Sequence, residues 1–201
     1  MNDQTSDACA GQGVDQFLST FGKQAGGAAK CLSVGKNGIV GFNGISGSAF
    51  AAKFGLMGRA TNYLVSNRAA TFTMMPGRSS QTEAHRGGFV DVYNRPPGGS
   101  FGVDPSRFPN NKYYFGLTMT ATEALVHEIG HAVSALIPGT AAAAQMSAAN
   151  TLLLRANRDL EGYATAFENV WRRTVLGETS MRSGYFSDGD IGYIPMSEIF
   201  P

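Results

Sequence analysis

The stretch TATEALVHEIGHAVSALIPG, residues 120–139, specifies both ends of a helix and constrains the fold more than any other part of the sequence. Thr120 and Glu123 form a T-x-x-E capping box, in which each side chain can bond to the backbone N–H of the other residue. Apolar residues follow at helical spacing, and Pro138-Gly139 stops the helix. The sequence therefore predicts a helix over residues 119–137.

Two of the three histidines of the chain, His127 and His131, lie on this helix, and Glu128 follows the first of them. Residues four apart are separated by about 40° around a helix axis and by about 6 Å along it. Both imidazoles can therefore reach one ion, and zinc accepts neutral imidazole nitrogen well. A glutamate beside the first ligand can take a proton from water without binding the metal itself. The pattern predicts a zinc site with Glu128 as general base.

A catalytic zinc site needs a third protein ligand. The chain has no histidine after His131, so the third ligand is an acid or the upstream His85. Glu161 is the preferred candidate, because Gly162 and Ala164 beside it would let its helix approach the first one closely. The alternatives that stay open are Asp159, His85, Asp188 and Asp190.

The rest of the chain predicts an α+β fold in a single domain. A second long helix is expected over residues 151–176, stopped near Gly177, and we expect it to pack on the first beside a small sheet. Small residues would let the two helices approach: Ala132, Ala135, Ala164 and Ala166. In chain order we expect a glycine-rich region (1–60), a strand-rich part (61–118), the metal-site helices (119–177) and a tail (178–201).

Local sequence patterns predict which helices and strands these parts contain. Residues 1–60 hold 12 of the 26 glycines, which favours short helices broken by turns, the first over residues 14–22. Three later runs have the aromatic and β-branched content of strands: TFTMM (71–75), GFVDVYN (88–94) and KYYFGLTM (112–119). Trp171 is expected in the core of the second helix.

Composition excludes several classes of protein. A net charge of +1 argues against a general nucleic-acid binder. The longest stretch without Asp, Glu, Lys or Arg, Ile129–Leu154, contains Pro138 and other polar or helix-breaking residues, so we expect no membrane span. The first thirty residues contain three aspartates and lack the charged start and apolar core of a secretory signal. Cys9 and Cys31 can form a disulfide or remain two free thiols, and both interpretations stay open.

HEIGHA, followed by a helix of the form E-x-x-A-x-x-x-E-N-x-x-R, resembles zincin metallopeptidases of the gluzincin type. More narrowly, it resembles the metallopeptidase domains of bacterial effectors and of Rhs/YD-repeat toxins. The matching residues are His127, Glu128, His131, Glu161, Ala164, Glu168, Asn169 and Arg172. The resemblance covers about residues 118–176.

The resemblance implies a zincin-like fold with zinc as cofactor and export as part of a larger toxin or effector. It makes the two histidines and Glu161 the metal ligands and Glu128 the base. It also implies that Glu168, Asn169 and Arg172 orient the ligands or dock the helix. Zincins commonly hold a peptide by adding it to an edge strand beside the metal helix. FVDVYN (89–94) is the candidate, ahead of KYYF (112–115).

The sequence departs from the gluzincin pattern at two points. Many gluzincins place an acid four residues after the third ligand, to orient the first histidine, and that position here is Thr165. Glu168 or a backbone carbonyl could take over that role. The histidine that often stabilises the transition state has no counterpart, so Tyr185 or Tyr193 would donate instead.

The sequence thus predicts a zinc-dependent hydrolase that acts on a polypeptide. Two other interpretations remain. One is a zincin-shaped binding or regulatory module without turnover. The other is a helical interaction domain in which HEIGH is incidental. Under any of these interpretations, a parent protein or an inhibitor is a further candidate partner.

Overall fold

The computed structural model describes residues 2–3, 12–35, 39–66, 70–74, 81–84, 99–103, 112–114, 117–136 and 161–179. Its helices are α1 (Gln12–Ser19), the 3₁₀ turn η2 (Gly22–Gln24), α2 (Ala25–Cys31), α3 (Gly47–Ser66), α4 (Ala121–Leu136), α6 (Glu161–Trp171) and the π-helical turn η4 (Arg172–Leu176). Its strands are β1 (Asn2–Asp3), β2 (Leu32–Val34), β3 (Val40–Phe42), β4 (Ala70–Met74), β5 (Gln81–Ala84), β6 (Gly99–Val103), β7 (Lys112–Tyr114) and β8 (Leu117–Met119).

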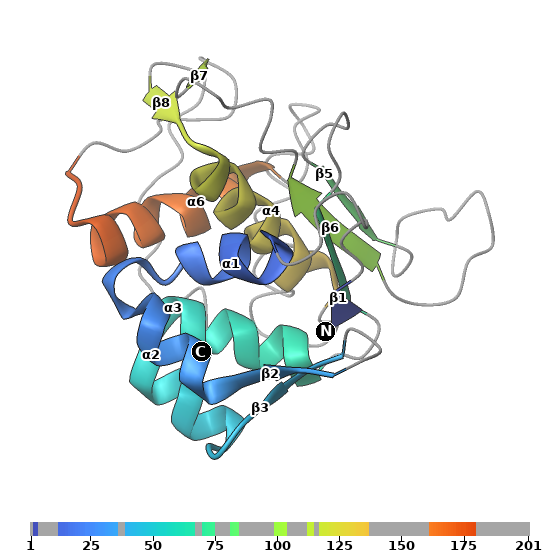
Figure 1. Cartoon of the computed structure of the whole chain (residues 1–201). Helices are drawn as coiled ribbons and strands as arrows, with labels where there is room; N and C mark the ends of the chain where they lie inside the picture. The colour runs from blue at the N-terminus through green and yellow to red at the C-terminus, as the bar shows by residue number, and fades with distance from the viewer. Residues whose placement is uncertain are drawn as a thin grey trace.

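A mixed sheet of four strands has the order β1-β4-β6-β5 (Figure 1). β1 and β6 both run parallel to β4, while β5 pairs antiparallel with β6. Two antiparallel hairpins, β2–β3 and β7–β8, complete the described strands. The α+β class predicted from the sequence is therefore confirmed.

Helix α4 lies at the centre of the described structure. It packs against α6, against strands β6 and β5 of the sheet, and against α1 and α3 (Figure 1). Neighbours on several sides explain why every residue from Glu123 to Val133 is buried. The expected packing of two helices beside a small sheet is thus observed.

An aromatic cluster fills the space between α1 and α3. Its rings meet edge-on or tilted, with centroids 4.5–6.0 Å apart, an arrangement that the ring quadrupole favours. The members are Phe17, Phe21, Phe42, Phe50 and Phe54. Trp171 belongs to the same core: it is 1% exposed, and its Nε1 donates to the carbonyl oxygen of Thr20 at 2.6 Å. The prediction that Trp171 is a core residue is confirmed.

Glycines break the helices of the N-terminal region, as expected. Helix α3 is kinked at Gly55, whose φ of 58° and ψ of −133° are strongly disfavoured for residues with a Cβ. α3 nevertheless runs to Ser66, so the first residues of the expected strand-rich part, 61–118, are helical. The first helix, predicted over 14–22, is observed as Gln12–Ser19.

The strand predictions have mixed outcomes. TFTMM corresponds to β4, and KYYFGLTM forms the two short strands β7 and β8 rather than one. GFVDVYN (88–94) lies outside the described residues. β5 and β6 were not expected, because QTEA lacks an apolar alternation and GSFGV is rich in glycine.

The predicted bounds of the second helix, 151–176, can be compared with the structure only where its residues are described. Residues 151–160 lie outside the described residues, and α6 covers Glu161–Trp171. The predicted stop near Gly177 is confirmed, since this residue caps η4 with a φ of 74°. Among the helices that the structure describes, none is long and apolar enough to cross a membrane.

Candidate metal centre

The capping box predicted for α4 is present. The backbone N–H of Glu123 donates to Thr120 Oγ1 at 3.2 Å, and the backbone N–H of Thr120 donates to Glu123 Oε2. These contacts satisfy two N–H groups at the helix start. They fix where α4 begins, and hence which residues fall on each face.

The two histidines of HEIGH lie side by side on α4. The ring centroids of His127 and His131 are 4.8 Å apart, with the rings nearly perpendicular at 85°. A tetrahedral zinc ion about 2.0–2.1 Å from each coordinating nitrogen would place two imidazole centroids about 5 Å apart. The observed separation therefore fits two ligands of one ion. Glu128 is also buried, at 7% exposure.

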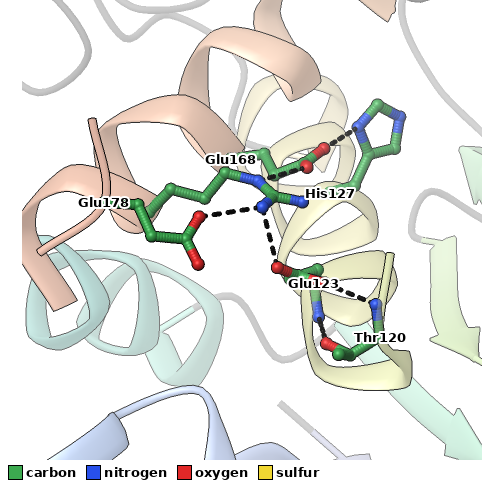
Figure 2. Close-up of polar contacts among 6 residues, drawn as sticks. Thr120, Glu123, His127, Glu168 and Glu178 are labelled. Carbon is green, nitrogen blue, oxygen red and sulfur yellow. Dashed lines mark hydrogen bonds and ion pairs between the residues drawn. The ribbon is translucent and has the colours of Figure 1, made fainter. Parts of the chain in front are cut away.

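Glu168 of α6 contacts the first histidine. Its Oε2 lies 3.3 Å from His127 Nδ1, and its side chain is fully buried (Figure 2). Metal-binding histidines commonly donate the N–H of one ring nitrogen to a carboxylate, which orients the other nitrogen toward the metal. With Glu168 on Nδ1, His127 would bind a metal through Nε2. The expectation that Glu168 could take the place of the gluzincin acid agrees with this contact.

The guanidinium of Arg172 forms ion pairs with three carboxylates, one of which is that of Glu168, the residue that contacts His127. Its Nε lies 3.0 Å from Glu168 Oε1, and its Nη1 lies 2.8 Å from Glu123 Oε1 and 3.0 Å from Glu178 Oε2 (Figure 2). Burial alone would lower the pKa of the guanidinium, but the charges of Glu168 and Glu123 and the hydrogen bonds to Glu168 and Glu178 outweigh it. The net effect raises the pKa of Arg172 above its ordinary value. The arginine therefore stays charged and holds Glu168 in place.

The sequence patterns did not identify the full set of these contacts. Arg172 and Glu168 were expected to orient ligands or dock the helix, whereas Glu123 was expected only as a capping residue and Glu178 was not singled out. The i, i+4 spacing of Glu168 and Arg172 was a usable signal for their ion pair. The contact with Glu123 depends on how two helices dock, which no local pattern specifies.

The helices α4 and α6 run antiparallel and approach each other closely at Gly130. Going along α4, Glu123 contacts Arg172 and His127 contacts Glu168. A Cβ on Gly130 would lie 2.9 Å from the Cα of Ala164. Ala164 was predicted to allow close approach, but Gly130 was not. The sequence signal for this close approach was a glycine between the two histidines of HEIGH, where alanine would be the better helix former.

The antiparallel register places the start of α6 toward the His131 end of α4. Glu161 is the first residue of α6, although its side chain lies outside what the structure describes. Two turns of helix separate it from Glu168. Its backbone position is therefore compatible with the expected third ligand, which remains a prediction.

The other predicted site residues lie outside the described residues. These are the alternative ligands Asp159, His85, Asp188 and Asp190 and the expected transition-state donors Tyr185 and Tyr193. Within the part of the chain that the structure describes, no group of three or more His, Cys, Asp or Glu side chains could hold a metal ion. Cys31 is a half-buried free thiol, and Cys9 lies outside the described residues.

The buried hydroxyl of Thr165 has no hydrogen-bond partner among the described residues. Thr165 is fully buried on α6, one turn before Glu168, and its Oγ1 makes no hydrogen bond within the described structure. Leaving a buried polar group unsatisfied costs about 1–3 kcal/mol. Such a group is expected where a ligand or a ligand-bearing side chain completes a site.

The chain was compared with protein-family models, with curated proteins and with solved structures, and none of them matches it.

Proposed function

We propose that the protein is a zinc-dependent peptidase, with His127, His131 and Glu161 as metal ligands and Glu128 as general base. The observation that carries the proposal is the histidine pair, with ring centroids 4.8 Å apart and a buried carboxylate on Nδ1 of the first ring. Two histidines on an ordinary buried helix would not need a fully buried Glu168–Arg172 ion pair behind them. A metal ligand that must keep one orientation does need such support.

The arrangement of elements supports a zincin-like fold for this peptidase. The helix that carries HEIGH lies against a second helix on one side and against strands β5 and β6 on another (Figure 1). In the described sheet β5 is one of the two edge strands, and it packs against α4. A peptide could add to this edge through main-chain hydrogen bonds. β5 therefore joins FVDVYN (89–94) as a candidate, whereas KYYF contributes to the separate hairpin β7–β8.

The chemistry divides between the metal and the side chains. Zinc, when bound, lowers the pKa of a coordinated water to about 7 and polarises the substrate carbonyl. Glu128 takes the proton from the attacking water and then delivers it to the leaving amine. Glu168 keeps the proton on Nδ1 of His127, so that Nε2 carries the lone pair for the metal. Tyr185 or Tyr193 would donate a hydrogen bond to the developing oxyanion.

The test is the substitution Glu128→Gln in the full chain. Glutamine has nearly the same size but cannot accept the proton, so zinc content and fold should persist while peptide hydrolysis falls about 10²–10⁴-fold. Unfolded protein and short peptides should both serve as substrates. Asp15→Asn, the same charge change at an exposed position of α1, is the matched control and should keep full activity.

Three outcomes would count against the proposal. Hydrolysis by Glu128→Gln at the wild-type rate would show that this glutamate is not the base. Wild-type protein that holds zinc but cleaves no substrate would favour a binding or regulatory module. Wild-type protein that holds no metal would favour a helical interaction domain.

A further inference from the structure

The hydroxyl of Thr165 behaves unlike those of Thr61 and Thr174, two other helical threonines of the described structure. Thr61 Oγ1 donates to the Met57 carbonyl at 2.7 Å, and Thr174 Oγ1 donates to the Val170 carbonyl at 2.8 Å. Each uses the carbonyl four residues earlier, which is the usual partner of a threonine inside a helix. Thr165 makes no such bond, although it is fully buried. Its hydroxyl is therefore directed elsewhere than at the carbonyl oxygen of Glu161.

The position of Thr165 on α6 determines which groups its hydroxyl can reach. Glu168 and Arg172 follow it by three and seven residues and both contact α4, so Thr165 lies on the same face of α6. Because α6 runs antiparallel to α4, Thr165 is displaced from the level of His127 toward that of His131. Its hydroxyl thus lies at the end of the helix pair where the metal site would be completed.

The nearest ligand candidate on the same helix is Glu161. It lies four residues before Thr165, the spacing at which helical side chains are neighbours. The Cα–Cβ bonds of an α-helix tilt toward its N-terminus, so the side chain of Thr165 leans toward the turn of Glu161. A carboxylate that binds a metal through one oxygen has a second oxygen able to accept a hydrogen bond. A neutral hydroxyl supplies that donor without adding charge.

We propose that Thr165 is a positioning residue for the metal site: its hydroxyl donates a hydrogen bond to the carboxylate of Glu161 when that carboxylate binds zinc. The proposal rests on the proposed function, since it requires the metal site. It accounts for a buried hydroxyl that has no hydrogen-bond partner within the described residues. The contact orients the third ligand, as Glu168 orients the first.

The experiment measures zinc affinity, by competition with a chromophoric chelator, and the Tm of the metal-free protein. Thr165→Val keeps the shape of the side chain and removes the hydroxyl. Zinc affinity should fall about 10–100-fold, the usual effect of losing a partner of a metal ligand. The Tm of the metal-free protein should stay the same or rise, because no hydrogen bond is lost and a buried unsatisfied group is removed. Thr165→Ser, which keeps the hydroxyl, should retain most of the affinity.

Thr61→Val is the matched control, because Thr61 is also fully buried in a helix but donates to a carbonyl. It should lower the Tm of the metal-free protein and leave zinc affinity unchanged. Repeating Thr165→Val in a Glu161→Gln background tests the named partner. If the hydroxyl acts through Glu161, its loss has almost no further effect there.

The outcomes separate the two proposals. Wild-type protein that binds no zinc overturns the proposed function and this inference together. If wild-type protein binds zinc and Thr165→Val binds it equally well, only the inference fails. It also fails if Thr165→Val lowers the Tm of the metal-free protein as Thr61→Val does, which would indicate a structural role. Equal losses of affinity with and without Glu161 would assign the hydroxyl to another group and overturn the named contact.

Discussion

Replacing Arg172 by methionine tests the buried ion-pair network that supports His127. Methionine keeps the apolar stem and removes the guanidinium, so the side chains of Glu168 and Glu123, 0% and 6% exposed, lose their common cation. Breaking one partner out of a buried ion pair typically costs about 3–5 kcal/mol. The side chain of Glu178 is 40% exposed, so its contact adds little to this figure.

The free energy of unfolding of the metal-free protein should therefore fall by about 3–5 kcal/mol. In a chain of this size each kcal/mol shifts Tm by about 2–4 °C, so a decrease of about 6–20 °C is expected. Urea denaturation followed by tryptophan fluorescence measures the change directly, because Trp171 is the only tryptophan and is buried beside Arg172. Arg173→Met, an exposed neighbour, should change stability by less than about 0.5 kcal/mol.

The pH dependence of this effect has a definite sign. The pKa of Arg172 is raised in the folded state, so the stability it contributes is fully present below the pKa of an unfolded arginine. That stability is lost only as the pH rises through the still higher folded value. Deprotonation of Arg172 should therefore not reduce its contribution between about pH 6 and pH 9. If Arg172→Met is no less stable than Arg173→Met, the network does not stabilise the fold and the reasoning is refuted.

Three further predictions concern the helices around the site. Gly130→Ala should destabilise the protein by about 1–3 kcal/mol, because its Cβ would meet the backbone of α6. The control Gly26→Ala, in open space on α2, should be neutral or stabilising. Urea denaturation compares the two variants, and equal effects on stability would refute the close approach of the helices. Thr120→Ala should cost about 0.5–2 kcal/mol through the lost cap, and thermal unfolding without any loss of stability would contradict that. Trp171→Phe should lower Tm, because the hydrogen bond to Thr20 is lost and a smaller ring leaves a cavity; an unchanged Tm would argue against both contributions.

The features that could be predicted from the sequence are those encoded locally. The capping box of Thr120 and Glu123, the extent of α4 and the stop at Gly177 depend on residues within a turn of one another. The histidine pair follows from helical periodicity alone. Because a segment whose start and stop are both specified by nearby residues has few alternatives, its structure agrees closely with its pattern.

The features that could not be predicted depend on contacts between segments that are far apart in the sequence. Strands β5 and β6 carry little local β propensity and are held by pairing with each other and with β4. Glu123 and Arg172 are 49 residues apart in the sequence and meet because two helices dock antiparallel. Gly130 has its role from the facing Ala164, which no spacing rule connects to it.

The central claim is that His127 and His131 bind zinc, and the most direct test is the zinc content of the purified chain. After equilibration with excess zinc and removal of unbound metal, elemental analysis should find one zinc per wild-type chain. His131→Ala should hold far less, because a site with one histidine fewer binds the ion poorly, while its helix persists. His85→Ala, which removes the remaining histidine, should leave the content unchanged if Glu161 is the third ligand. Wild-type protein without zinc, or His131→Ala with a full equivalent, would contradict the account.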